Sequence, residues 1–138
     1  LGETRPLPAH CWPHLDQVYV MSYQPWHKQP YEPWLSECVN RFLKAGLPRE
    51  KLILGVGFFA KEKAGDRRAV SWKNSINRDL PTLDHGFWPV GKEACEMRIK
   101  LVNQHKLGGV MVWDYGHDSM DPDHSLLRYL SRRLNNSQ

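Results

Sequence analysis

The sequence predicts an α/β fold built on a parallel sheet, because three short apolar segments alternate with three amphipathic helical segments. The apolar segments are residues 15–23, 52–59 and 107–113, and a helical pattern follows each of them in turn. Strands that alternate with helices in this way are typical of βα units, in which neighbouring strands run parallel. We therefore expect one α/β domain, residues 1–138, made of three βα units.

Each predicted strand ends in polar and aromatic residues, and the last strand shows this most clearly. Val110 to Trp113 is continuously apolar, which is typical of a strand buried on both faces. Ligands and catalysis gather at the carboxyl ends of parallel strands. Four polar or aromatic residues follow the strand there: Asp114, Tyr115, His117 and Asp118. We expect a functional site at this end. The alternative is that Trp113 only packs against the core.

Periodic apolar residues define the three helices. They predict a first helix over 34–43, which ends at Gly46, a second over 92–105 and a third over 126–134. The third helix is expected to be capped by one of two residues, Asp123 or Ser125. Residues 61–68 are charged, and 80–91 hold Pro and Gly, so both segments are predicted to be loops.

Composition narrows the possible functions. Of the six Trp, four lie in predicted loops or at a strand end, namely Trp12, Trp26, Trp88 and Trp113. Exposed aromatic rings of this kind favour stacking against sugar rings or bases. The net charge is only +4 and no basic block is longer than an Arg pair, which argues against binding of nucleic acid. No apolar run approaches about 18 residues, and no signal peptide opens the chain, so we expect no membrane span.

The three cysteines predict neither a zinc site nor a cofactor. No Cys-x-x-Cys pair occurs, and Cys38 and Cys95 lie in helical patterns, where buried free thiols are expected. Cys11 could pair with a group outside this chain. The chain starts at Leu1 without Met, and a complete (β/α)8 barrel takes about 250 residues, so we expect a piece of a longer protein.

Three motifs together resemble the last three strands of glycoside hydrolase family 18, the chitinases and their relatives. They are Met21-Ser22-Tyr23, Leu52-Ile53-Leu54-Gly55-Val56-Gly57-Phe58-Phe59 and Gly108-Gly109-Val110-Met111-Val112-Trp113. The family fold is a (β/α)8 TIM barrel. The resemblance therefore implies that the three βα units are strands 6–8 at the C-terminal part of such a barrel.

The resemblance assigns a catalytic role to Tyr23. In the family the sixth strand ends in Met-x-Tyr-Asp, and the Tyr hydroxyl holds the N-acetyl group of the sugar at the cleavage subsite. Met21 and Tyr23 match this motif, but Gln24 replaces the Asp. An amide can hydrogen-bond an acetamido group, but it cannot carry the negative charge that steadies an oxazolinium-like intermediate.

Other substrate-binding residues follow from the same resemblance. Trp113 matches the eighth-strand Trp that forms the hydrophobic floor of the subsite, and Phe59 stands where many members have Tyr. Trp26, close to the Met-x-Tyr motif, is expected to contact substrate as well. The expected ligand is an N-acetylglucosamine oligosaccharide or chitin, and no cofactor or metal is expected.

The catalytic acid of the family is missing from these residues. Members carry Asp-x-x-Asp-x-Asp-x-Glu on the fourth strand, where Glu protonates the leaving oxygen and the substrate acetamide is the nucleophile. Here Asp118, Asp121 and Asp123 have the right spacing, but Ser125 stands in the Glu position, and Pro122 would interrupt a strand. We predict a loop and helix N-terminus at 118–125, and no hydrolysis by this chain alone.

Two alternative ligand roles stay open near the last strand. With His124, the same Asp cluster could bind Ca²⁺, although it lacks the Gly and the terminal Glu of an EF-hand loop. His117 lies next to the expected site, where it either contacts ligand or sits as a solvated loop residue.

Three functions remain possible. The first, which we favour, is the C-terminal part of a chitinase-like glycosidase that needs the missing N-terminal half of its barrel or self-association. The second is a non-catalytic chitin-binding or carbohydrate-binding relative, favoured by Gln24. The third is an unrelated α/β domain that binds another planar ligand. Family analogy also predicts an extracellular or secreted protein.

Overall fold

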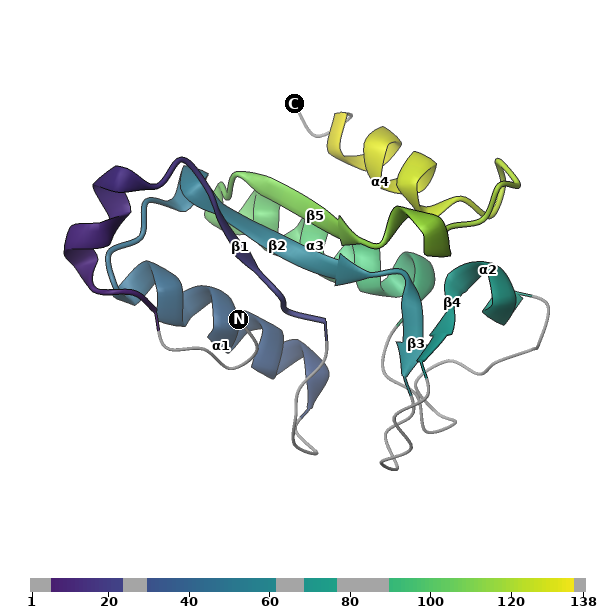
Figure 1. The fold of residues 1–138 in the computed structure, drawn as a ribbon, viewed down its shortest axis with the longest axis horizontal. Coiled ribbons are helices and arrows are strands. Elements are labelled where there is room, and N and C mark those ends of the chain that lie inside the picture. Colours follow the sequence, from purple (N-terminus) through teal and green to yellow (C-terminus); the bar gives the residue numbers. More distant parts are fainter. Residues whose placement is uncertain (1–5, 24–29, 62–68, 77–89, 136–138) are drawn as a thin grey trace. The chain divides into compact units, whose positions relative to one another are not determined.

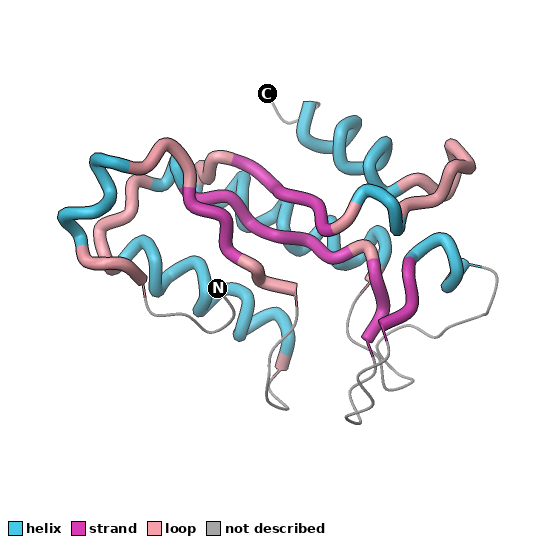
Figure 2. Tube along the Cα trace, viewed as in Figure 1, coloured by secondary structure: helices cyan, strands magenta, loops and turns pink. Residues whose placement is uncertain are grey.

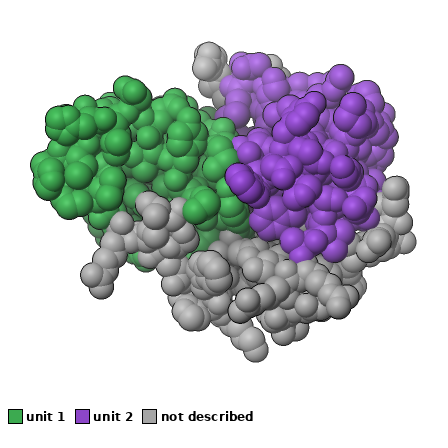
Figure 3. All heavy atoms as spheres, viewed as in Figure 1, with its two compact units in different colours: residues 1–56, 100–111 green, residues 57–99, 112–138 purple. Residues whose placement is uncertain are grey.

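The computed structural model describes four stretches of the chain. They are residues 6–23, 30–61, 69–76 and 90–135. The chain divides into two compact units, each made of two segments (Figure 3). Unit 1 comprises residues 1–56 and 100–111, and unit 2 comprises residues 57–99 and 112–138.

In residues 6–23, 30–61, 69–76 and 90–135, the main sheet has three strands, β1 (Val18–Val20), β2 (Leu52–Gly57) and β5 (Gly109–Trp113), in the order β1-β2-β5. β1 pairs with β2 in parallel, and Val18 lies opposite Leu52. The arrows of the three strands run in the same direction in Figure 1. The predicted α/β class with a parallel sheet is therefore confirmed.

Burial differs among the three strands. β2 is buried from Leu52 to Val56, as expected for a central strand covered on both faces. β5 is only half-buried, and Trp113 exposes 54% of its surface. The prediction that Val110 to Trp113 is buried on both faces is wrong. β5 ends the sheet order, so among the described strands it has a neighbour on one side only.

The three predicted helices are confirmed as α1 (Tyr31–Lys44), α3 (Gly91–His105) and α4 (Leu126–Asn135) (Figure 2). The face of α1 that the apolar periodicity marks is buried, through Trp34, Leu35, Cys38, Val39 and Phe42. Gly46 has a φ of +84°, which glycine adopts without strain, and α1 ends just before it. No helix within the described stretches is both long enough and apolar enough to span a bilayer.

Short elements complete the part of the chain that the structure describes. There, 3-10 helices cover Ala9–His14, Arg49–Lys51 and Tyr115–His117. β3 (Phe59–Lys61) and β4 (Ala69–Ser71) form an antiparallel pair in which Phe59 lies opposite Ser71, and α2 (Trp72–Ser75) follows.

The predicted strand 52–59 is thus two strands, because the backbone turns away at Phe58. The Phe58 amide donates to the Trp113 carbonyl at 2.8 Å, and the Phe58 carbonyl accepts from the Trp72 amide at 2.8 Å. Lys61 belongs to β3 rather than to a loop, and Gly91 starts α3. The remaining residues of the two predicted loops, apart from Val90, lie outside the described stretches.

In unit 2 a polar cluster joins α3 to α4. The Glu96 carboxylate accepts hydrogen bonds from the Tyr129 hydroxyl at 2.5 Å and from Arg133 Nε and Nη2 at 2.8 and 3.0 Å. The paired bonds from one guanidinium give the charge-assisted geometry that holds a carboxylate most firmly. Lys92 lies over the Tyr129 ring, with Nζ 5.5 Å from the ring centroid.

Candidate functional site

In unit 1 the Met-x-Tyr motif directly follows β1. The buried Ser22 anchors it, because its Oγ donates to the Gly55 carbonyl at 3.1 Å and its amide donates to the Val20 carbonyl at 2.8 Å. Met21 is 44% exposed and Tyr23 is half-buried. The fixed Ser22 therefore holds two partly accessible side chains at the end of the strand.

The Tyr23 hydroxyl contacts a poor hydrogen-bond acceptor. It donates to Met111 Sδ, and the two atoms are 3.8 Å apart. A thioether sulfur accepts only weakly, so a ligand carbonyl could replace it at little cost in free energy. The geometry suits a phenol that binds an acceptor such as an amide oxygen.

In unit 2 Trp113 ends β5 with its backbone fixed and its side chain exposed. Its carbonyl accepts the hydrogen bond from the Phe58 amide, while the residue stays 54% exposed. An indole in this state offers an apolar face for stacking. Its exposure argues against the alternative of a plain core role.

Phe59 and His117 contact each other in unit 2. Their rings meet edge to face, with centroids 6.4 Å apart. The Asp114 carboxylate accepts from the His117 amide at 3.1 Å, and Asp114 Oδ2 lies 3.7 Å from His117 Nε2. The His117 side chain is half-buried and contacts Phe59 and Asp114. It is therefore not a fully solvated loop histidine.

The segment 118–125 is a loop that leads into α4, as predicted. Asp118 is buried, and its carboxylate accepts from the Ser119, Leu126 and Leu127 amides and from Ser125 Oγ. The four distances lie between 2.8 and 3.1 Å. These bonds fill the accepting capacity of a carboxylate, so Asp118 acts as a helix cap.

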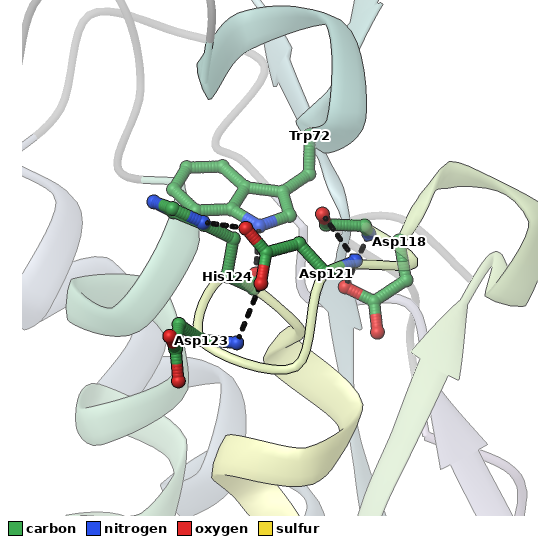
Figure 4. Close-up of polar contacts among 6 residues, drawn as sticks. Trp72, Asp118, Asp121, Asp123 and His124 are labelled. Carbon is green, nitrogen blue, oxygen red and sulfur yellow. Dashed lines mark hydrogen bonds and ion pairs between the residues drawn. The ribbon is translucent and has the colours of Figure 1, made fainter.

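Of the two predicted caps, only Ser125 fills this role, since its Oγ accepts from the Arg128 amide at 3.2 Å. The alternative, Asp123, is wrong: its amide donates to Asp121 Oδ1 at 3.0 Å, within the loop shown in Figure 4. Asp118 comes eight residues before Leu126. Capping residues are expected directly before a helix, so the sequence did not predict that Asp118 caps α4.

The rest of the acidic loop is open to solvent. Asp121 Oδ2 lies 2.7 Å from His124 Nδ1, and the Trp72 indole donates to the His124 carbonyl at 2.7 Å (Figure 4). The Asp123 amide, and then the His124 side chain, hold the pKa of Asp121 below its ordinary value. Over the described stretches no three His, Cys, Asp or Glu side chains gather as metal ligands do.

The sequence-predicted site residues fall into three groups. Met21 and Tyr23 lie in unit 1, Phe59 and Trp113 lie in unit 2, and Gln24 and Trp26 lie outside the described stretches.

Sequence reasoning gave no role to Met111, although the alternation of side chains along a strand, counted back from Trp113, points to it. Neither did it assign a role to Tyr31, whose contact with Tyr23 has no local sequence signal.

The fold is that of chitinases and chitinase-like proteins. Solved structures of this class match nearly the whole chain, whereas no family model and no curated protein sequence matches it. The resemblance to glycoside hydrolase family 18 is therefore confirmed at the level of the fold.

Three of these structures show the extent of the match. A chitinase-like agglutinin from Robinia pseudoacacia is 19% identical with a TM-score of 0.70, over 92% of this chain and 49% of that chain. The human pseudo-chitinase YKL-39 is 11% identical with a TM-score of 0.69, over 92% and 52%. The family 18 chitinase ChiB from Flavobacterium johnsoniae is 20% identical with a TM-score of 0.68, over 93% and 45%. The chain spans about half the length of these structures.

Proposed function

We propose that this chain is the C-terminal part of a chitinase-like glycoside hydrolase and supplies strands 6–8 of its TIM barrel. The substrate is a polysaccharide that contains N-acetylglucosamine, cleaved by the substrate-assisted retaining mechanism. One observation carries the proposal: in a chain with a chitinase fold, Met21-Ser22-Tyr23 follows β1 and presents the Tyr23 hydroxyl to a weak acceptor, Met111 Sδ.

Tyr23 has the central chemical role in this proposal. Its hydroxyl exchanges the thioether for the carbonyl oxygen of the substrate acetamide and donates a hydrogen bond to it. That bond orients the acetamide for attack on the anomeric carbon, which is the nucleophilic step of this mechanism. By the family resemblance, Trp113, which is 54% exposed, would supply the apolar floor for the sugar ring. The same resemblance proposes Met21, Gln24, Trp26 and Phe59 as further substrate-binding residues.

A second function is favoured by one residue. Gln24 replaces the Asp of the family motif, so the negative charge that steadies the intermediate is absent. Two of the matching structures are a chitinase-like agglutinin and a pseudo-chitinase with retained chitooligosaccharide binding properties. A non-catalytic chitin-binding or carbohydrate-binding relative is therefore the second candidate.

The sugar proposal is tested by titrating chitotetraose into the intact protein that carries this chain. Trp113→Ala should weaken binding about 5- to 150-fold, since stacking and buried area together contribute about 1–3 kcal/mol. Cellotetraose has the same length and linkage without acetamido groups, so it serves as the matched ligand control and should bind far more weakly. Unchanged binding of chitotetraose by Trp113→Ala would count against the proposal.

Turnover distinguishes the two candidates. A fluorogenic N-acetylglucosamine dimer should be cleaved by the intact protein of the first candidate but not by the second. Tyr23→Phe should then lower turnover more than binding, because the hydroxyl orients the acetamide. The 138 residues alone should show no turnover, since they lack the Glu of the family acid motif and general acid help contributes about 10²- to 10⁴-fold in rate.

A protein with this function would also need a partner for its strands and a location where chitin occurs. The three strands would pair with the N-terminal half of the barrel or with a second copy of this chain. By analogy with chitinases, the protein would act outside the cell, and fractionation of the native source would test this.

A further inference from the structure

The position of Tyr23 depends on two residues outside its own strand. We infer that Tyr31 and Gly55 are positioning residues, which place the Tyr23 hydroxyl before any sugar arrives. This inference rests on the proposed function of Tyr23 in binding the acetamide. All of the contacts behind it lie within unit 1.

Tyr31 fixes the backbone from which the Tyr23 side chain starts. Its hydroxyl donates to the Tyr23 carbonyl at 2.6 Å, at the short end of ordinary O–H···O distances. The Tyr31 ring is itself buried and packs against Trp34, with ring centroids 5.7 Å apart. Because α1 begins at Tyr31, this hydrogen bond fixes Tyr23, which follows β1, to the start of α1.

Gly55 provides the space that the Tyr23 ring occupies. A Cβ at this position would lie 2.8 Å from Tyr23 Cε1 and 2.7 Å from the Val20 carbonyl oxygen. The same point is 3.4 Å from the Met111 methyl group. Since real Cβ atoms do not approach other atoms so closely, any larger residue would push the Tyr23 ring or β1 away.

These contacts serve binding by limiting the freedom of Tyr23. A side chain that is already fixed in its bound position loses less conformational entropy when the ligand binds. The hydroxyl is held beside Met111 Sδ, a weak acceptor that it can give up for a stronger one. Tyr31 and Gly55 thus act through Tyr23 and need not touch the sugar.

The positioning is tested first without any ligand, by ¹⁹F NMR of the intact protein that carries this chain, labelled with 3-fluorotyrosine. Tyr23→Phe identifies the Tyr23 signal, because that signal alone disappears from the spectrum. Tyr31→Phe should shift and narrow that signal because the ring gains freedom. The matched control is Tyr129→Phe, which removes one hydroxyl hydrogen bond, to Glu96, and should leave the Tyr23 signal unchanged. An unchanged Tyr23 signal in Tyr31→Phe would overturn the inference.

Gly55→Ala should move the Tyr23 signal further than Tyr31→Phe does. Should Gly55→Ala prevent folding, Tyr31→Phe still decides the question, because it removes one oxygen atom and creates no clash.

Chitotetraose binding then separates a positioning role from a merely structural one. Tyr31→Phe should weaken binding about two- to tenfold in the otherwise native protein, the effect of one hydrogen bond. In a Tyr23→Phe background the same change should have no effect, because the hydroxyl to be positioned is gone. Equal losses in both backgrounds would refute the positioning role. Failure of the unaltered protein to bind chitotetraose would instead refute the proposed function, while the NMR result would still decide whether Tyr31 and Gly55 position Tyr23.

Discussion

Asp118 shows at the scale of one residue how a motif can mislead. Its spacing to Asp121 and Asp123 imitates an acidic catalytic motif, yet its carboxylate is buried and accepts four hydrogen bonds at the start of α4. Two of those bonds satisfy the Leu126 and Leu127 amides, which have no partner within the helix. Residue type and spacing alone do not reveal this difference.

We predict that Asp118→Ala lowers the free energy of unfolding by about 1–3 kcal/mol, because it removes a cap and leaves buried donors unsatisfied. The matched control is Asp123→Ala, which removes an exposed carboxylate from the same loop and should change stability by less than about 0.5 kcal/mol. Urea unfolding of both variants measures the difference. Equal stabilities would show that the Asp118 cap contributes nothing.

Cys95 should be chemically inert in the folded chain. Burial raises the pKa of its thiol to about 12, and the positive charge of Arg98 opposes this only in part. Since the thiolate is the reactive form, iodoacetamide at pH 8 should modify the half-buried Cys11 first and Cys95 only after unfolding in urea. Mass spectrometry of the peptides measures the order, and early Cys95 labelling would contradict its burial.

At the scale of secondary-structure elements, the Glu96 cluster links α3 to α4 in a pH-dependent way. The hydrogen bonds from Arg133, followed by that from Tyr129, lower the pKa of Glu96 below its ordinary value of 4.5. A carboxylate whose folded pKa is lowered adds stability above its unfolded pKa and loses it as the pH falls through the folded pKa.

We therefore predict that the chain loses stability as the pH drops below about 4.5, and that Glu96→Gln flattens this part of the profile. Glu37→Gln is the control, since the ion pair of Glu37 with Arg41, at 3.9 Å, is exposed to solvent. Melting temperatures between about pH 3 and about pH 7, a range that includes the ordinary pKa of Glu, test the difference. Identical profiles for the two variants would argue against the cluster.

Local periodicity predicted the elements well and their ends poorly. The apolar face of α1 is encoded within 14 residues, so its pattern was sufficient. The break between β2 and β3 depends on two hydrogen bonds that no local pattern contains: the Phe58 amide donates to the Trp113 carbonyl, and the Phe58 carbonyl accepts from the Trp72 amide. Likewise, Tyr23 followed from the family resemblance, whereas its contacts with Tyr31 and Gly55 depend on the tertiary fold.

At the scale of the whole molecule, the strand order leaves β1 and β5 with one strand neighbour each among the described strands. Tyr19 on β1 is 50% exposed and Met21 beyond it is 44% exposed. Unpaired strand edges with apolar side chains favour pairing with another chain.

We predict that the 138-residue chain alone does not persist as a stable monomer and instead self-associates or pairs with the rest of its barrel. Light scattering after size-exclusion chromatography should give a mass above the 16.1 kDa of one chain. A single monomeric species with a cooperative thermal transition would contradict this prediction and the barrel-fragment proposal with it.

The Gly108-Gly109 pair determines where this chain can be cut or rejoined. A Cβ on Gly108 would lie 2.2 Å from the Glu50 carbonyl oxygen, and the Gly108 amide donates to the Arg49 and Leu52 carbonyls. A Cβ on Gly109 would meet no atom within 4 Å. Glycine is favoured there because its φ is +144°, a backbone conformation that other residues rarely adopt. New chain ends at this pair, in a circular permutation or a split reporter, would disrupt the Gly108 hydrogen bonds and release the Gly109 backbone. New ends in the exposed loop between Met120 and His124 would leave the start of β5 intact.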